Sequence, residues 1–93
     1  MGDRIIEVSG FDAYLSASRR QIAVKRDGEV VGRFPAEDVG LLVVDTPMAS
    51  FSNETLLALV EGGGLAILCG ADHLPAAWVL PVAMYCFLPV MVF

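Results

Sequence analysis

This sequence has few basic residues, few cysteines and a single histidine, and each shortage excludes a class of function. Lysine and arginine together number 6 against 11 aspartates and glutamates, which gives a formal net charge of −5. Isolated nucleic-acid-binding modules usually carry a basic stripe, whereas this net charge repels a phosphate backbone. Any contact with DNA must therefore come from a local patch or from a partner.

The two cysteines, Cys69 and Cys86, lie in apolar stretches and do not form a C-x-x-C pair. The opening segment MGDRIIEV carries charges early and has no long apolar stretch behind it, so it does not have the pattern of a signal peptide. We therefore expect a cytoplasmic protein of a reducing compartment, with two buried thiols.

The segment from Cys69 to His73 brings a thiol, the carboxylate of Asp72 and the single imidazole within five residues. Catalytic zinc needs three protein ligands, usually from more than one segment, and the sequence has no second histidine to join them. Apolar surroundings raise the pKa of a thiol, which is the opposite of what a nucleophilic cysteine needs. The sequence thus predicts no catalytic residue and no metal ligand.

The first half of the chain predicts strands and tight turns within a single domain. Asp27-Gly28 is a strong signal for a two-residue hairpin turn, because both residues tolerate positive φ. Pro35 then ends the strand that follows this turn, since proline donates no backbone hydrogen bond. The result is a β-meander of about four strands, expected at residues 4–8, 11–16, 21–26 and 29–34.

The second half predicts a strand, a helix and another strand. The run LLVVD at 41–45 suits a strand buried on both faces. Ser52 is a good helix N-cap, and the glycines at 62–64 end the helix, whereas a phosphate-binding loop has its glycines where a helix begins. A further buried strand is expected at 65–69. The fold class is therefore α+β: a small β-rich domain of meander and hairpins, followed by strand–helix–strand.

Five of the six basic residues fall close together on the expected hairpins. One interpretation is a solvated sheet edge that is kept charged against aggregation. The other is a DNA-facing basic hairpin that touches a phosphate backbone within a larger assembly. The residues concerned are Arg19, Arg20, Lys25, Arg26 and Arg33.

The run AYLSASRRQIAVKRDGEVVGRFPAEDVGLLVVDTP resembles the amino-terminal domain of the CRISPR-associated integrase family, the first of the CRISPR-associated proteins. The segment RDGEVVGRFPAEDVGLLVVD is the most specific part, and GLAILCGADHLPAAWVLP matches the family's buried strand and His-Leu-Pro segment. The resemblance covers roughly residues 4 to 82 and is strongest to the type II branch. It implies a β-rich module that makes the homodimer interface and is joined by a linker to a helical domain.

The resemblance also implies a metal-dependent DNA endonuclease and integrase that acts in spacer acquisition and antiviral defence in prokaryotes. In the full-length family, Glu, His and Asp of the helical domain hold the divalent metal, Mg or Mn, and the partners are the second CRISPR-associated protein and double-stranded DNA. His73 belongs to the His-Leu-Pro segment and does not match the catalytic histidine. We therefore expect a non-catalytic fragment without a cofactor of its own that keeps the homodimerisation surface.

The final stretch, AAWVLPVAMYCFLPVMVF, holds no charged residue. Its apolar run only just reaches the length of a membrane span and contains Pro75, Pro81 and Pro89, so no membrane is expected. We divide the chain into an amino-terminal dimerisation domain at 1–82 and an apolar tail at 83–93. The tail departs from the family pattern, as a frameshift or a premature stop would produce.

Three alternatives stay open from the sequence alone. The tail could fold back as an extra strand on the core. The protein could be a stand-alone interaction module that binds a full-length integrase through the same dimer surface. It could also be a small membrane-tethered protein.

Overall fold

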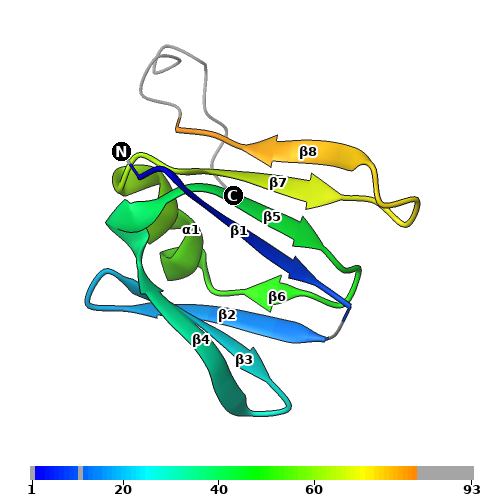
Figure 1. Ribbon diagram of the computed structural model, residues 1–93, viewed down its shortest axis with the longest axis horizontal. Coiled ribbons are helices and arrows are strands. Elements are labelled where there is room, and N and C mark those ends of the chain that lie inside the picture. Colours follow the sequence, from blue (N-terminus) through cyan, green and yellow to red (C-terminus); the bar gives the residue numbers. More distant parts are fainter. Residues whose placement is uncertain (1, 11, 82–93) are drawn as a thin grey trace, which may run out of the picture.

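A computed structural model describes residues 2–10 and 12–81 of the chain. It confirms the expected class, a small β-rich α+β domain with one α-helix (Figure 1). The predictions for the tail at 83–93 and for Cys86 lie outside the described residues. In chain order the elements are β1 (Arg4–Ser9), β2 (Ala13–Ser18), β3 (Gln21–Arg26), β4 (Glu29–Pro35), the 3-10 helix η1 (Ala36–Asp38), β5 (Val39–Asp45), β6 (Ser50–Phe51), α1 (Asn53–Glu61), β7 (Leu65–Cys69) and β8 (Pro75–Val79).

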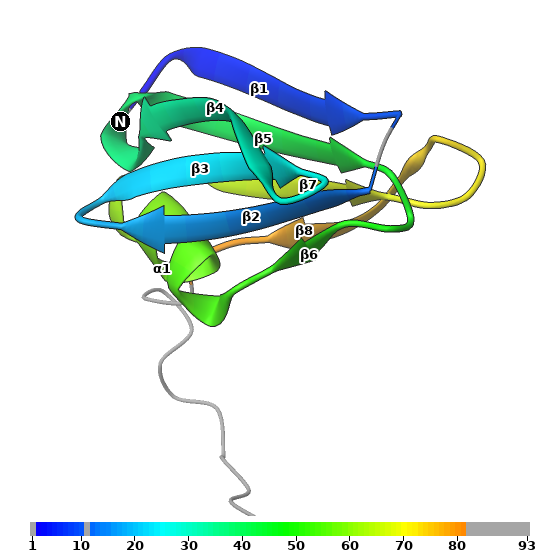
Figure 2. The same cartoon turned by 90° about the horizontal axis from the view of Figure 1, so that it is seen from below.

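The strands form two four-stranded sheets, with α1 at one end of them (Figures 1 and 2). Sheet A has the order β1-β5-β7-β8, in which β1, β5 and β7 run parallel and β8 runs antiparallel to β7. Sheet B has the order β4-β3-β2-β6, in which β2, β3 and β4 form an antiparallel meander. The short β6 pairs with β2 in parallel.

The prediction of a four-strand meander is wrong for its first strand. β1 lies in sheet A, whereas β2, β3 and β4 lie in sheet B. Ile5 pairs with Leu41 and Val8 with Val44 in β5. The reason lies in β5, a continuous apolar strand that needs a neighbouring strand along each edge. β1 and β7 supply these two neighbours, which leaves β2, β3 and β4 as a three-strand meander.

The core lies between the two sheets and is built from the inward-facing residues of each strand, because side chains alternate along a strand. The helix contributes Leu59, which is fully buried. The core residues are Val8, Ala13, Leu15, Ile22, Val24, Phe34, Ala36, Val39, Leu42, Val44, Leu59 and Ala66.

The helix begins where the sequence predicted it. The Ser52 side chain accepts a hydrogen bond from the backbone N–H of Thr55 and so caps α1. The buried Thr55 hydroxyl donates to the backbone carbonyl of Leu15 at 3.1 Å, which ties the helix to β2. Of the described residues, α1 and η1 are the only helical segments, and neither is long and apolar enough to cross a membrane.

Two tight turns shape sheet B. Asp27 and Gly28 have φ of 52° and 81°, which confirms the expected hairpin turn between β3 and β4. Arg19 and Arg20 also have positive φ, 53° and 63°, in the turn between β2 and β3. Both hairpins are therefore closed by two-residue turns, and their registers fix which side chains share a face.

Candidate functional site

The outer face of sheet B carries two of the five basic residues that the sequence singled out. Lys25 pairs directly with Tyr14, and Arg33 pairs with Ala23. Residues opposite each other in an antiparallel pair point to the same side. Residues two apart along a strand also share a side, as Ala23 and Lys25 do on β3. Tyr14, Lys25 and Arg33 therefore share one face. We call this set, together with the small residues between them, the outer face of sheet B: Tyr14, Ser16, Ala23, Lys25 and Arg33.

The other three basic residues lie elsewhere. Arg19 is in the turn at the far end of the β2–β3 hairpin. Arg20 lines a hollow of about 280 Å³ that also includes Glu37 and Glu61. Arg26 pairs with Glu29 at the tip of the β3–β4 hairpin. The fold therefore divides the five basic residues among four places: the outer face of sheet B, the β2–β3 turn, the hollow and the tip of the β3–β4 hairpin.

Tyr14 is the exposed aromatic residue of this face, with 43% of its surface accessible. Together with Lys25 it lines a shallow hollow of about 380 Å³, whose rim includes Met48 and Ser50. The carboxylates of Asp12 and Asp27 also lie on this rim, at the end of the sheet next to the Asp27-Gly28 turn. The positive charge of the face therefore extends from Lys25 toward Arg33, away from these two carboxylates.

Sheet A presents an apolar surface on the side that faces away from the core. The strand registers place its members in two rows across β1, β5, β7 and β8. Ile5 is 68% accessible and Trp78 is 55% accessible, and the side chains between them are only half buried. We call this set the outer face of sheet A: Ile5, Leu41, Leu65, Val43, Ile67 and Trp78.

The expectation that residues 41–45 are buried on both faces holds for only one face within the described residues. Leu42 and Val44 are buried in the core, whereas Leu41 and Val43 on the other side are half buried. Nothing in the ranges 2–10 and 12–81 covers this second face closely enough to bury it. An apolar face of a parallel sheet is usually covered, so this one is a candidate interaction surface.

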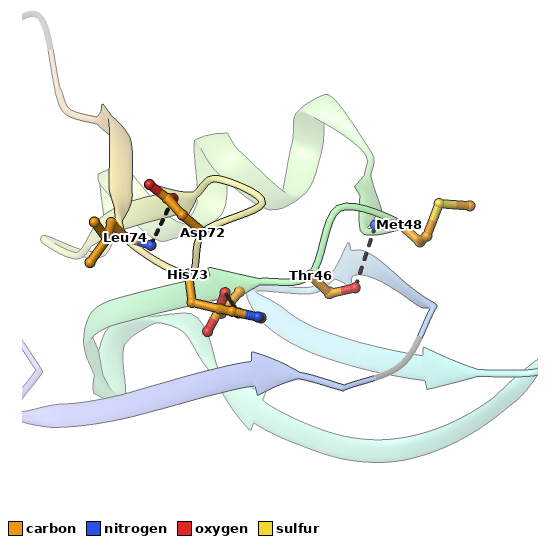
Figure 3. Close-up of polar contacts among 6 residues, drawn as sticks. Thr46, Met48, Asp72, His73 and Leu74 are labelled. Carbon is orange, nitrogen blue, oxygen red and sulfur yellow. Dashed lines mark hydrogen bonds and ion pairs between the residues drawn. The ribbon is translucent and has the colours of Figure 1, made fainter.

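The parallel strands of sheet A end in a polar cluster. The His73 imidazole Nδ1 lies 2.9 Å from Asp45 Oδ1, so the loop after β7 contacts the end of β5. In the same loop, the Leu74 backbone N–H donates to Asp72 Oδ1 at 3.2 Å (Figure 3). Burial raises the pKa of the Cys69 thiol, and the nearby carboxylates of Asp45, Glu7 and Asp72 raise it further.

This cluster does not form a metal site. Over the part of the chain that the structure describes, no three His, Cys, Asp or Glu side chains are placed to hold a metal ion. The divalent metal that the resemblance implies for the full-length family thus has no ligand set among these residues. The glycines at 62–64 end α1, with Gly62 as the C-cap, as the sequence predicted.

Two functional candidates were missed at the level of sequence, the exposed Tyr14 and the outer face of sheet A. The alternation of Tyr14 with the apolar residues Ala13 and Leu15 predicts that its side chain points away from the core, but does not assign it a function. The exposure of Trp78 could not be predicted, because the short run from Pro75 to Val79 shows no alternation of polar and apolar residues.

Comparison with known proteins gives relatives of one kind. No family model matches the chain. It is 31% identical over 71 residues to the CRISPR-associated endonuclease Cas1 of Neisseria meningitidis serogroup C (strain 8013), a match that covers 76% of this chain and 23% of that protein.

Solved structures share the fold at low sequence identity. A partial Cas6–RT–Cas1–Cas2 complex matches with a TM-score of 0.76 at 11% identity, over 87% of this chain and 24% of that chain. A casposase bound to its integration product matches with 0.70 at 10% identity, over 85% and 24%. A TtCas1–DNA complex matches with 0.65 at 14% identity, over 84% and 25%. The chain therefore spans about a quarter of the length of the relatives it matches.

Proposed function

We propose that this chain, which corresponds in sequence and fold to the small amino-terminal β-rich part of Cas1, is the dimerisation module of a CRISPR integrase that acts in spacer acquisition. The match covers 23% of the relative's length. The metal-dependent DNA chemistry, with Mg or Mn, is assigned to the part of the integrase outside this match. The chain itself is then a non-catalytic cytoplasmic module.

The proposal of a dimer rests on the apolar outer face of sheet A. Its members are apolar, and Glu7 is the one charged residue in its two rows. Burying a large aliphatic or aromatic side chain stabilises an association by about 1.5–3 kcal/mol. In a two-fold dimer the same face is used by both copies, so each apolar row is buried twice. Because this face is nearly uncharged, the net charge of −5 on each copy does not oppose the contact at close range.

The outer face of sheet B supports a second part of the proposal, contact with double-stranded DNA. Arg33 lies opposite Ala23 in the sheet register, and Ala23 is two residues from Lys25 along β3, so the two basic residues are diagonal neighbours on this face. Arg19 extends the positive charge at the turn. Arg20 contributes less, since Glu37 and Glu61 share its hollow, and so does Arg26, since the acidic Glu29 lies opposite it in the strand register. Solved structures of similar fold include a Cas1 complex with DNA and a complex with Cas2, which supports this assignment.

Sedimentation of the full chain tests the dimer. We expect a dimer for the unmodified chain and a monomer for Val43→Lys, which places a charge at the centre of the outer face of sheet A. Leu57→Lys, on the exposed side of α1, is the matched control and should leave the dimer intact. A Val43→Lys variant that remains dimeric and folded would show that the contact lies elsewhere.

Incubation with duplex DNA and manganese tests the non-catalytic assignment. We expect no cleavage by the purified chain, since the match leaves out most of the length of Cas1. Cleavage that persists through stringent purification and scales with protein concentration would overturn it.

The same apolar face favours one alternative, a stand-alone module that binds a full-length integrase. The outer face of sheet A would then pair with the equivalent face of an intact partner and produce a mixed dimer. Co-purification of the chain with a full-length integrase from the same cell, lost in Val43→Lys, would support this function. Exclusive self-association in that mixture would rule it out.

A further inference from the structure

Three of the four edge strands in the described part of the chain have features that discourage the addition of another strand. The edges are β1 and β8 in sheet A and β4 and β6 in sheet B. An edge strand presents unpaired N–H and C=O groups, and proteins protect such edges with charges, prolines, bulges or very short strands. β1 carries Arg4 and Glu7, and β6 has 2 residues. β4 carries Glu29 and Arg33, and a register shift interrupts its pairing with β3.

β8 is the exception, at the outer edge of sheet A (Figure 1). After Pro75, its residues 76–79 carry neither charge nor proline, and no strand of the described residues pairs with its outer edge. Ala76, Ala77 and Trp78 are all exposed. Since successive side chains of a strand point to opposite faces, both faces of β8 are open as well as its edge. β8 therefore has the surroundings of a strand that lacks a neighbour.

The side chains around this edge are apolar. Leu74 is 61% accessible just before β8, and Leu80 is 48% accessible just after it. The run between them, LPAAWVL at 74–80, holds no charged residue. A strand that adds to this edge is therefore expected to be uncharged and rich in apolar side chains.

We propose that residues 82–93 of the same chain supply this strand and pair with β8 in an antiparallel hairpin. β8 ends at Val79, so Leu80 and Pro81 alone separate it from this segment. Proline fits the second position of a β-turn, because its fixed φ is the one that the turn requires. A segment tethered this closely reaches the edge at an effective concentration on the order of millimolar, which favours it over a second copy in dilute solution.

The composition of this segment matches the requirements of the edge. Residues 82–93 carry no charge, and the stretch AMYCFL at 83–88 contains neither proline nor glycine. This stretch has the length of β1, which has 6 residues. Tyr85 and Phe87 belong to the residue types enriched in strands, and Pro89 is suited to end the pairing because it donates no backbone hydrogen bond. The segment would thus close the edge that association between molecules otherwise uses.

This inference goes beyond the proposed dimer and does not depend on it. The edge consists of backbone groups of β8, whereas the proposed dimer rests on the side chains of the outer face of sheet A, with Val43 at its centre. Val43→Lys should therefore break the dimer and leave the pairing at β8 intact. The two proposals can fail separately.

Amide hydrogen exchange of the full chain, followed by NMR, tests the pairing. Alternate residues of 76–79 point their N–H groups away from β7, and such an amide exchanges freely when no strand accepts from it. We expect these outward amides to exchange at least about tenfold more slowly than free amides. This protection should not depend on protein concentration and should persist in Val43→Lys.

Two proline variants, Tyr85→Pro and Cys86→Pro, should break the pairing. Adjacent residues of a strand point their N–H groups to opposite edges, so one of these two positions donates to β8 and loses its donor as proline. We expect that variant to lose the protection of the outward amides. Tyr85→Ala and Cys86→Ala keep the donor and are the matched controls. The amide of the buried Leu42 in β5 should stay protected in every variant, which shows that the core is intact.

Free exchange of the outward amides in the unmodified chain would overturn the inference. Protection that rises with protein concentration, or that disappears in Val43→Lys, would overturn it too, because a second copy then covers the edge. Protection that survives in both proline variants would mean that another segment pairs with β8. If a proline variant fails to fold, nuclear Overhauser effects between 76–79 and 83–88 in the unmodified chain decide: their presence supports the hairpin and their absence rules it out.

Discussion

His73 joins the loop between β7 and β8 to the end of β5, with its imidazole Nδ1 2.9 Å from Asp45 Oδ1. Two backbone hydrogen bonds close the same loop: the His73 N–H donates to the Gly70 carbonyl, and the Gly70 N–H donates to the Leu74 carbonyl. His73 itself has a φ of 62°, in the left-handed region. Position 73 therefore has two requirements, a side chain that reaches Asp45 and a backbone that tolerates positive φ.

We expect His73→Ala to destabilise the protein more than His73→Asn does. The His73 side chain that makes the contact with Asp45 is 73% exposed, so the loss of this contact costs about 1 kcal/mol or less in either variant. Alanine also pays a penalty of about 1–2 kcal/mol for the left-handed backbone, which asparagine tolerates. Urea unfolding followed by the fluorescence of Trp78, the single tryptophan, measures the difference. Equal midpoints for the two variants would contradict the backbone part of this prediction.

The thiol of Cys69 should be slow to react in the folded protein. Burial first, and then the carboxylates of Asp45, Glu7 and Asp72, raise its pKa above the ordinary value. The folded state therefore holds the thiol proton more tightly than the unfolded state, and stability should fall as the pH rises through the unfolded pKa.

The rate of alkylation by iodoacetamide at mildly alkaline pH measures the reactivity of this thiol. The experiment uses a Cys86→Ser variant, in which Cys69 is the single cysteine. The folded protein should react more slowly than the urea-unfolded chain, and Asp45→Asn should speed the reaction by removing one negative charge. A folded-state rate equal to the unfolded rate would show that Cys69 is not perturbed.

Gly64 should not tolerate a side chain. A Cβ at this position would lie 2.6 Å from the Val39 carbonyl oxygen and 2.7 Å from Leu59 Cδ1. We expect Gly64→Ala to lower the free energy of unfolding by about 1–3 kcal/mol, as overpacking in a core does. Gly32→Ala is the matched control, because nothing lies within 4 Å of its Cβ position and its φ is not in the left-handed range. Thermal unfolding of both variants should show a loss for Gly64→Ala alone.

The contact of α1 with β2 depends on two hydroxyls that also contact each other. Thr55→Val removes the donor to the Leu15 carbonyl and should cost about 1 kcal/mol, while Ser52→Ala removes the helix cap and should cost a similar amount. The Ser52 and Thr55 hydroxyl oxygens lie 2.9 Å apart, so the double variant should lose less than the two single losses combined. Strict additivity in chemical denaturation would mean that the two hydroxyls act independently.

The parts of the fold that the sequence predicted are those set by local chemistry. The Asp27-Gly28 turn needs positive φ at two adjacent residues, which Asp-Gly tolerates readily. Ser52 caps α1 because its hydroxyl meets the N–H of a residue three positions later. The pairing of β1 with β5 is not local, because it depends on which strand the apolar β5 selects as its neighbour. No pattern within residues 4–8 carries that information.

The site was harder to predict because it too depends on contacts between segments that are distant in the sequence. Basic residues that are adjacent in the sequence separate in space, because side chains alternate across a sheet and a turn redirects those at its ends. Arg20 is offset by Glu37 and Glu61, which come from η1 and α1. The sequence does predict the concentration of positive charge on the β2–β3–β4 hairpins, but only the strand registers show that Lys25 and Arg33 share a face with Tyr14.

The pairing of the first strand with the fifth also sets an order of assembly. The hairpins of β2, β3 and β4 join neighbours along the chain, so they can close early and quickly. β1 leaves the ribosome first, yet its partner β5 follows only after the whole meander. During synthesis the apolar residues Ile5, Ile6 and Val8 therefore remain without a paired strand until β5 has been made. The yield of folded protein should depend on how quickly β5 is synthesised and pairs with β1.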